Sequence, residues 1–210
     1  SPRMAWRAIQ SALPKDAIIS SDIGNNCAIG NAYPTFEEGR KYLAPGLFGP
    51  CGYGLPSIMG AKIGRRDVPV VGFAGDGAFG ISMNEMSAIG REEWPAITMV
   101  IFRNYQWGAE KRNTTLWFED NFVGTELDQQ VSYAGVAKAC GVEGVAVSTM
   151  DELRDTLTKA VDAQMNDGVT TFIEVLLNQE LGEPFRRDAM KKPVSVAGIS
   201  QADMRPQQSV

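Results

Sequence analysis

The sequence predicts an α/β fold: a doubly wound, mainly parallel sheet with helices on both faces. Short β-rich runs alternate with helical stretches along most of the chain, which is the pattern of such a sheet. The run at residues 68–74 is almost continuously apolar, as expected of a strand buried on both faces, and Pro69 fits only at its beginning. A second buried strand is expected at residues 96–102.

The remaining elements follow from local signals. An amphipathic helix is expected around Trp6 to Leu13, where Pro14 ends it. We expect strands at residues 17–20, 142–147 and 171–177, helices at 54–63, 81–90, 132–140 and 150–165, a polar turn at 22–26, and irregular structure over 33–53. The sequence predicts one domain over residues 1–185, followed by a C-terminal tail at 186–210.

Composition excludes several classes of function. The formal net charge of −5 gives no electrostatic reason to expect a nucleic acid or membrane partner, and no apolar run is long enough to span a bilayer. Cys27, Cys51 and Cys140 are far apart and form no CxxC pair, so a cytoplasmic location is expected. The chain has no histidine, which excludes Ser-His and Cys-His nucleophile pairs, HExxH metal sites and a histidine general base.

The most informative segment follows the strand expected at 68–74. Gly75-x-Gly77-x-x-Gly80 matches a dinucleotide-binding fingerprint, but Asp76 would repel a pyrophosphate unless a cation lay between them. The next strand also ends in Arg103-Asn104 rather than in the acidic residue that would bind a ribose hydroxyl. A nucleotide site is therefore not favoured, and an ordinary tight turn remains the simple alternative.

Asp76 and Asn104 instead indicate a metal site. Each follows a buried strand, and the carboxyl ends of parallel strands meet at one edge of a sheet. Carboxylate and amide oxygens suit Mg²⁺, which is commonly completed by phosphate oxygens and water. For Asn104 a strand-end cap is the alternative. Gly75, Gly77 and Ala78 would let the backbone approach the phosphates at a helix N-terminus.

Gly75-Asp76-Gly77, followed at this interval by Asn104, resembles the magnesium motif of thiamine diphosphate enzymes. Residues 46–56 resemble that family's loop before its Gly-Leu-Pro helix, and residues 22–26 match a neighbouring loop that reaches the diphosphate. The resemblance runs from residue 16 to about residue 179 and implies a C-terminal diphosphate-binding domain. Arg103-Asn104 stands where an Asn-Asn pair is common in the family.

The resemblance implies a set of site residues. Asp76, Asn104 and the backbone carbonyl of Gln106 would bind Mg²⁺, and Trp107, Gly108 and Ala109 would border the thiazolium. Cys51 occupies the position, often methionine, that props the bent cofactor. The full cofactor-binding set is Gly24, Asn25, Asn26, Gly49, Cys51, Gly75, Asp76, Gly77, Ala78, Asn104, Gln106, Trp107, Gly108 and Ala109.

Two segments, 104–113 and 121–128, closely resemble the sulfoacetaldehyde acetyltransferases. These enzymes convert sulfoacetaldehyde and phosphate into acetyl phosphate and sulfite. Both substrates are anions, so Lys111 and Arg112 are candidate anion-binding residues, with a solvated helix face as the alternative.

The resemblance places no catalytic residue in this chain. The glutamate that activates the cofactor is expected from an N-terminal domain of a second subunit, in a homo-oligomer. An acetolactate-synthase-like carboligase is the alternative activity, and a non-catalytic interaction domain that kept the fold is the alternative from another class.

Overall fold

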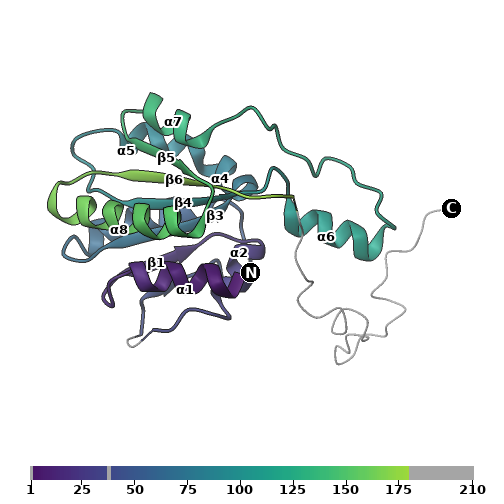
Figure 1. Ribbon diagram of the computed structural model, residues 1–210, viewed down its shortest axis with the longest axis horizontal. Coiled ribbons are helices and arrows are strands. Elements are labelled where there is room, and N and C mark those ends of the chain that lie inside the picture. Colours follow the sequence, from purple (N-terminus) through teal and green to yellow (C-terminus); the bar gives the residue numbers. More distant parts are fainter. Residues whose placement is uncertain (1, 37–38, 180–210) are drawn as a thin grey trace. The chain divides into compact units, whose positions relative to one another are not determined.

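A six-stranded parallel sheet forms the centre of the chain (Figure 1). The computed structural model describes residues 2–36 and 39–179. The strands are β1 (Ile18–Ser21), β2 (Tyr42–Leu43), β3 (Val70–Gly75), β4 (Thr98–Arg103), β5 (Glu143–Val147) and β6 (Thr171–Leu176), in the spatial order β2-β1-β3-β4-β6-β5. Every neighbouring pair is parallel, which confirms the predicted fold class.

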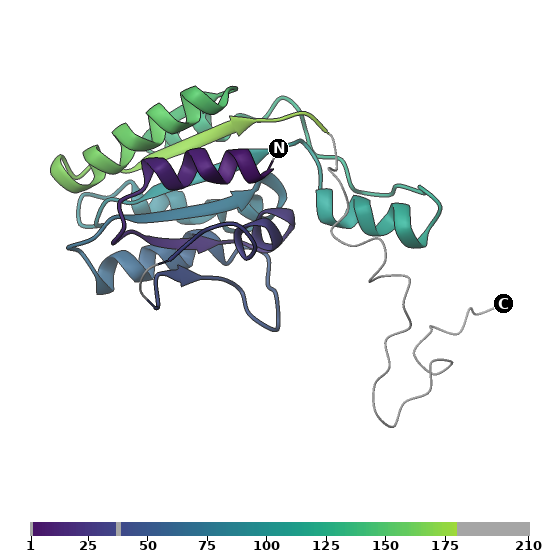
Figure 2. The same ribbon diagram turned by 60° about the horizontal axis from the view of Figure 1, so that its bottom comes forward.

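Helices cover both faces of the sheet. On one face α1 (Pro2–Ala12) and α8 (Met150–Asn166) lie side by side (Figure 2) and bury Phe73, Val100 and Ile173. On the other face lie α3 (Gly54–Gly64), α4 (Asp76–Ser82), the 3-10 turn η1 (Met83–Glu85), α5 (Met86–Ile89) and α7 (Tyr133–Ala139). Successive residues of β4, such as Met99 and Val100, enter opposite cores because strand side chains alternate between faces.

The strand order reverses beside β1. The chain leaves β1 through α2 (Asn25–Gly30) for the edge strand β2, and then returns through α3 to β3 on the other side of β1. Ligands of open α/β sheets bind beyond the carboxyl ends of the strands at such a reversal. In both views α6 (Gly108–Trp117) lies beyond these strand ends, apart from the helices that cover the sheet.

Several elements differ from the sequence-based expectation. The helix expected at 81–90 begins earlier, at Asp76, whose carboxylate accepts a hydrogen bond from the Gly77 N–H and stabilises the helix N-terminus. The 3-10 turn η1 interrupts this helix at Met83–Glu85. Helix α2 takes up only the last two residues of the turn expected at 22–26, and no helix was delimited where α6 lies. The helix expected at 150–165 is confirmed as α8, which Thr149 and Glu152 start with a capping box.

The described residues 2–36 and 39–179 all belong to one compact unit. The domain boundary expected at residues 185–186 and the tail after it lie outside the described residues. Within the part that the structure describes, no helix combines the length and apolarity needed to cross a bilayer.

Two glycines test the packing of helices on the sheet. A Cβ on Gly144 in β5 would lie 2.1 Å from the carbonyl oxygen of Ala134 in α7, whereas a Cβ on Gly60 in α3 would meet no atom within 4 Å. We expect Gly144→Ala to lower the free energy of unfolding by about 1–3 kcal/mol, because backbone atoms must move apart. Gly60→Ala should raise it by up to about 1 kcal/mol, because alanine favours helix.

Urea unfolding followed by circular dichroism measures both changes. Equal stability of the two variants would contradict the described contact between α7 and β5.

Candidate metal centre

Asp76 is the buried carboxylate at the carboxyl end of β3, with only 2% of its surface exposed. Its Oδ1 accepts a hydrogen bond from the Gly77 N–H at 3.0 Å, and its Oδ2 accepts one from the Tyr105 N–H at 2.6 Å. Burial raises the pKa of Asp76, while these hydrogen bonds and the nearby charge of Arg103 partly offset the increase. Two backbone donors therefore fix the carboxylate in a defined orientation.

Three oxygen atoms converge beside Asp76. The side-chain oxygen of Asn104 lies 3.0 Å from the carbonyl oxygen of Gln106 and 3.2 Å from Oδ1 of Asp76. If the amide were turned by half a rotation, its nitrogen would occupy this position and donate hydrogen bonds to both atoms. The structure thus brings together the three residues that the sequence predicted as metal ligands.

The geometry fits a small, hard cation. Mg²⁺ binds oxygen in an octahedron with bonds of about 2.1 Å, so adjacent ligand oxygens lie about 3 Å apart. The separations of 3.0 and 3.2 Å match this edge length. A carboxylate, an amide and a carbonyl oxygen are also the ligand types that Mg²⁺ prefers. The amide orientation that faces its oxygen toward Asp76 is the one that a cation would stabilise.

The centre uses a single carboxylate. Among residues 2–36 and 39–179, no three His, Cys, Asp or Glu side chains come close enough together to hold a metal ion by themselves. A site of this composition leaves several coordination positions for ligands from outside the chain, as expected where phosphate oxygens and water complete the shell.

The Trp107 indole packs directly on the turn after β3. A Cβ on Gly77 would lie 2.7 Å from Cε3 of Trp107, so only glycine fits this position without displacing the ring. The loop that follows β4 is held in place by residues 125 and 126. The backbone N–H of Trp107 donates to the Thr125 carbonyl, and Gln106 forms an antiparallel bridge with Glu126. Ala78 is buried in the first turn of α4, and Ala109 is half-buried in the first turn of α6.

The asparagines after β1 lie beside two glycines that flank this centre in the sequence. A Cβ on Gly108 would lie 3.0 Å from Nδ2 of Asn104 and 3.2 Å from Nδ2 of Asn25. A Cβ on Gly75 would lie 3.6 Å from Oδ1 of Asn26. The amide nitrogen of Asn26 donates to Ser21 and to the Asp22 carbonyl, so this side chain is fixed by the protein itself. Gly24 precedes α2 with a φ of 120°, which favours glycine.

Asp22, which follows the neighbouring strand β1, has a structural role that the sequence did not reveal. It is fully buried at the end of β1, and its carboxylate accepts hydrogen bonds from the backbone N–H groups of Ile23, Gly52 and Gly54. Burial raises the pKa of Asp22 above its ordinary value, and these hydrogen bonds offset only part of the increase. Asp22 therefore fixes the loop before α3 against β1. An acidic residue directly after a buried strand was the sequence signal that could have indicated this role.

The loop held by Asp22 contains Gly49 and Cys51. A Cβ on Gly49 would contact the Ile23 side chain at 3.4 Å, and Gly49 has a φ of 62°. The Cys51 thiol is exposed, and its pKa is raised by partial burial and then by the charges of Asp22 and Glu110. The predicted role of Cys51 as a prop for the bent cofactor stays a prediction.

Lys111 and Arg112 lie in α6. The Lys111 ammonium donates to Oε1 of Gln106 at 3.1 Å, forms an ion pair with Glu126 and lies 5.1 Å from the centre of the Phe122 ring. In this arrangement Lys111 supports the Gln106 loop. Burial lowers the pKa of Arg112. Anion binding by these two residues stays a prediction.

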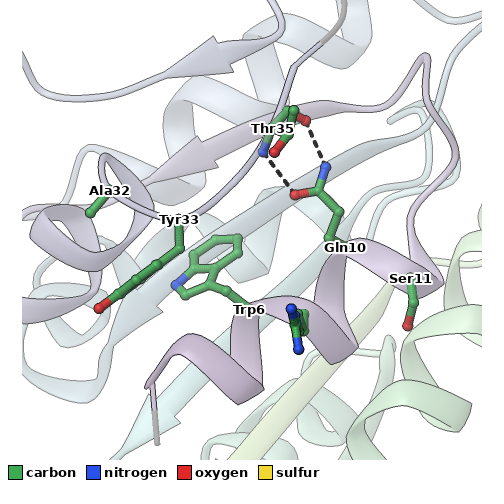
Figure 3. Close-up of a pocket in the computed structure, with 7 residues that line it drawn as sticks. Trp6, Gln10, Ser11, Ala32, Tyr33 and Thr35 are labelled. Atoms are coloured by element: carbon green, nitrogen blue, oxygen red, sulfur yellow. Dashed lines mark hydrogen bonds between the residues drawn. The ribbon is translucent and has the colours of Figure 1, made fainter.

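A separate pocket lies between α1 and the segment after α2 (Figure 3). Its polar centre is Gln10, whose side-chain amide forms hydrogen bonds with both the N–H and the carbonyl of Thr35. None of the predicted site residues lines this pocket. The residues that line it are Trp6, Arg7, Gln10, Ser11, Ala32, Tyr33 and Thr35.

Several known proteins are similar to this chain in sequence or in fold. The chain is 78% identical to the sulfoacetaldehyde acetyltransferase of Roseovarius nubinhibens over 99% of its own length, and it spans 34% of that protein. It is 29% identical to acetolactate synthase 1, chloroplastic, of Nicotiana tabacum over 77% of its length. The thiamine diphosphate-dependent 4-hydroxybenzoylformate decarboxylase of Rhodococcus jostii RHA1 has the same fold, with a TM-score of 0.76, 22% identity and coverage of 86% of this chain and 33% of that one.

Residues 22–175 match the family described as "Thiamine pyrophosphate enzyme, C-terminal TPP binding domain". This match begins directly after β1 and contains β3, β4 and the three converging oxygens beyond the ends of those two strands. The chain therefore belongs to the family of thiamine pyrophosphate enzymes, as their C-terminal TPP-binding domain.

Proposed function

We propose that this chain is the cofactor-binding part of a sulfoacetaldehyde acetyltransferase that converts sulfoacetaldehyde and phosphate into acetyl phosphate and sulfite. The observation that carries this proposal is the 78% identity to such an enzyme over 99% of the chain. The corresponding identity to an acetolactate synthase is 29%, which makes the carboligase the weaker candidate. The chain spans about a third of the first relative, so the activity belongs to a larger protein.

The proposed role of the metal centre is to hold the diphosphate of the cofactor through Mg²⁺. Asp76, Asn104 and the Gln106 carbonyl would supply three oxygen ligands, and phosphate oxygens would complete the octahedron. Gly77 lets the backbone lie close to the Trp107 ring, and the first N–H groups of α4 face the same edge of the sheet. When bound, thiamine diphosphate would supply a nucleophilic carbon for reaction with the aldehyde.

The reaction is balanced without an external oxidant. The aldehyde carbon is oxidised to the acyl level while the neighbouring carbon loses sulfite and becomes a methyl group, and phosphate accepts the acetyl group. The activating carboxylate is proposed to come from an N-terminal domain of a second subunit, as the resemblance to thiamine diphosphate enzymes implies. We propose an oligomeric, cytoplasmic enzyme whose site is completed at that interface.

The activity itself is the first test. We expect the complete protein, supplied with Mg²⁺ and thiamine diphosphate, to release sulfite and acetyl phosphate in equal amounts from sulfoacetaldehyde and phosphate. Sulfite can be measured by a thiol-exchange dye, and acetyl phosphate as its hydroxamate. Acetolactate formed from pyruvate, without sulfite release, would favour the carboligase; neither product would favour the interaction domain.

The metal ligand gives the second test. Asp76→Ala should weaken Mg²⁺-dependent binding of thiamine diphosphate by at least about tenfold, because the only carboxylate of the centre is removed. Isothermal titration of the complete protein with the cofactor, at fixed Mg²⁺, measures this change. Asp167→Asn, at the exposed end of α8, is the matched control and should bind normally. Unchanged affinity of Asp76→Ala would remove Asp76 from the metal site.

A further inference from the structure

A buried ion pair lies behind the metal centre. Arg103, the last residue of β4, and Glu174 in β6 are 3.3 Å apart, and their side chains are only 3% and 2% exposed. The second carboxylate oxygen of Glu174 accepts hydrogen bonds from Ser132 Oγ and the Ala134 N–H, both at 3.0 Å. The Glu174 carboxylate is thus fixed on both oxygens and holds the guanidinium in one place.

The guanidinium of Arg103 contacts two tyrosines. Its carbon lies 4.6 Å from the ring centre of Tyr105 and 5.0 Å from that of Tyr133, and its Nη2 donates to the Asp128 carbonyl at 2.9 Å. A planar, delocalised cation can stack on aromatic faces in a way that lysine cannot.

Both tyrosines make hydrogen bonds with Asp76. The Tyr105 N–H donates to Oδ2 of the carboxylate at 2.6 Å, and the Tyr133 hydroxyl donates to the Asp76 carbonyl at 3.2 Å. Tyr105 has a φ of 61°, a left-handed conformation that is unfavourable for a residue with a bulky side chain. Such a conformation persists only where the surrounding structure imposes it, and the Arg103 contact with the Tyr105 ring is one such restraint.

We propose that Arg103, paired with Glu174, is a positioning residue for the metal ligand Asp76. It holds Tyr105 and Tyr133 so that the Asp76 carboxylate presents Oδ1 toward Asn104 and Gln106. This assignment rests on the proposed metal-binding function of these three residues. A buried ion pair stabilises a fold less than well-packed apolar side chains would. Stability alone therefore does not explain this pair, whereas orientation of the Asp76 carboxylate does.

The experiment measures metal affinity separately from stability. Mn²⁺ binding to the complete protein, with thiamine diphosphate present, is followed by electron paramagnetic resonance, and thermal unfolding is recorded on the same samples. The variants are Arg103→Met and the double variant Arg103→Met/Glu174→Gln. The double variant leaves no uncompensated buried charge, so it should unfold at a higher temperature than Arg103→Met.

The matched control is Lys62→Met. Lys62 is another buried cation, and its ammonium donates to the carbonyls of Arg66 and Val68 at the opposite edge of the sheet. Its removal should lower thermal stability without changing the Mn²⁺ affinity.

We expect Mn²⁺ to bind at least about tenfold more weakly to both Arg103 variants, as is typical when support behind a metal ligand is removed. Wild-type affinity in the double variant would overturn the assignment and leave Arg103 as a partner for Glu174 alone. If the wild-type protein binds neither Mn²⁺ nor thiamine diphosphate, the proposed function itself fails. If Arg103→Met does not fold, the double variant decides the question.

Discussion

The buried carboxylate of Asp76 is the constraint on which the rest of the site depends. A charged group in this position is unfavourable unless hydrogen bonds and an opposite charge compensate for the loss of water. The N–H groups of Gly77 and Tyr105 supply the hydrogen bonds, and they also determine the direction of the carboxylate. Gly77 must lack a side chain because of Trp107, and Tyr105 must adopt a left-handed conformation. Several unusual local features thus serve one group.

The parallel topology explains why such distant residues meet. Asp22, Asp76 and Asn104 follow β1, β3 and β4, which are adjacent in the sheet and end at the same edge. Two of these strand ends carry buried carboxylates with different roles. Asp22 accepts hydrogen bonds from the loop before α3, whereas Asp76 faces Asn104 and the Gln106 carbonyl. The partners of each carboxylate therefore separate a structural carboxylate from a candidate metal ligand.

Much of this arrangement could be predicted from the sequence. The buried strands at 70–75 and 98–103 have unmistakable apolar runs, and the carboxylate inside a glycine-rich loop indicated a cation. Elements without a periodic signal were missed: α6 begins in the turn that follows Asn104, and α2 begins in a polar turn.

Contacts between distant residues could not be predicted either. Arg103 was noticed only as a departure from an Asn-Asn pair, because its partners Glu174 and Tyr133 are far away in the sequence. The hydrogen bonds of Asp22 to the backbone of Gly52 and Gly54 depend on the fold in the same way. Lys111 was predicted as an anion-binding residue or part of a solvated helix face, and its contacts with Gln106 and Glu126 became visible only in three dimensions.

Anomalous diffraction can locate the metal of the proposed centre. Crystals of the complete protein grown with Mn²⁺ and thiamine diphosphate would be measured at the manganese absorption edge. We expect one anomalous peak about 2 Å from Oδ1 of Asp76, the side-chain oxygen of Asn104 and the carbonyl oxygen of Gln106. A bound cofactor whose anomalous peak lies away from these three atoms would contradict it.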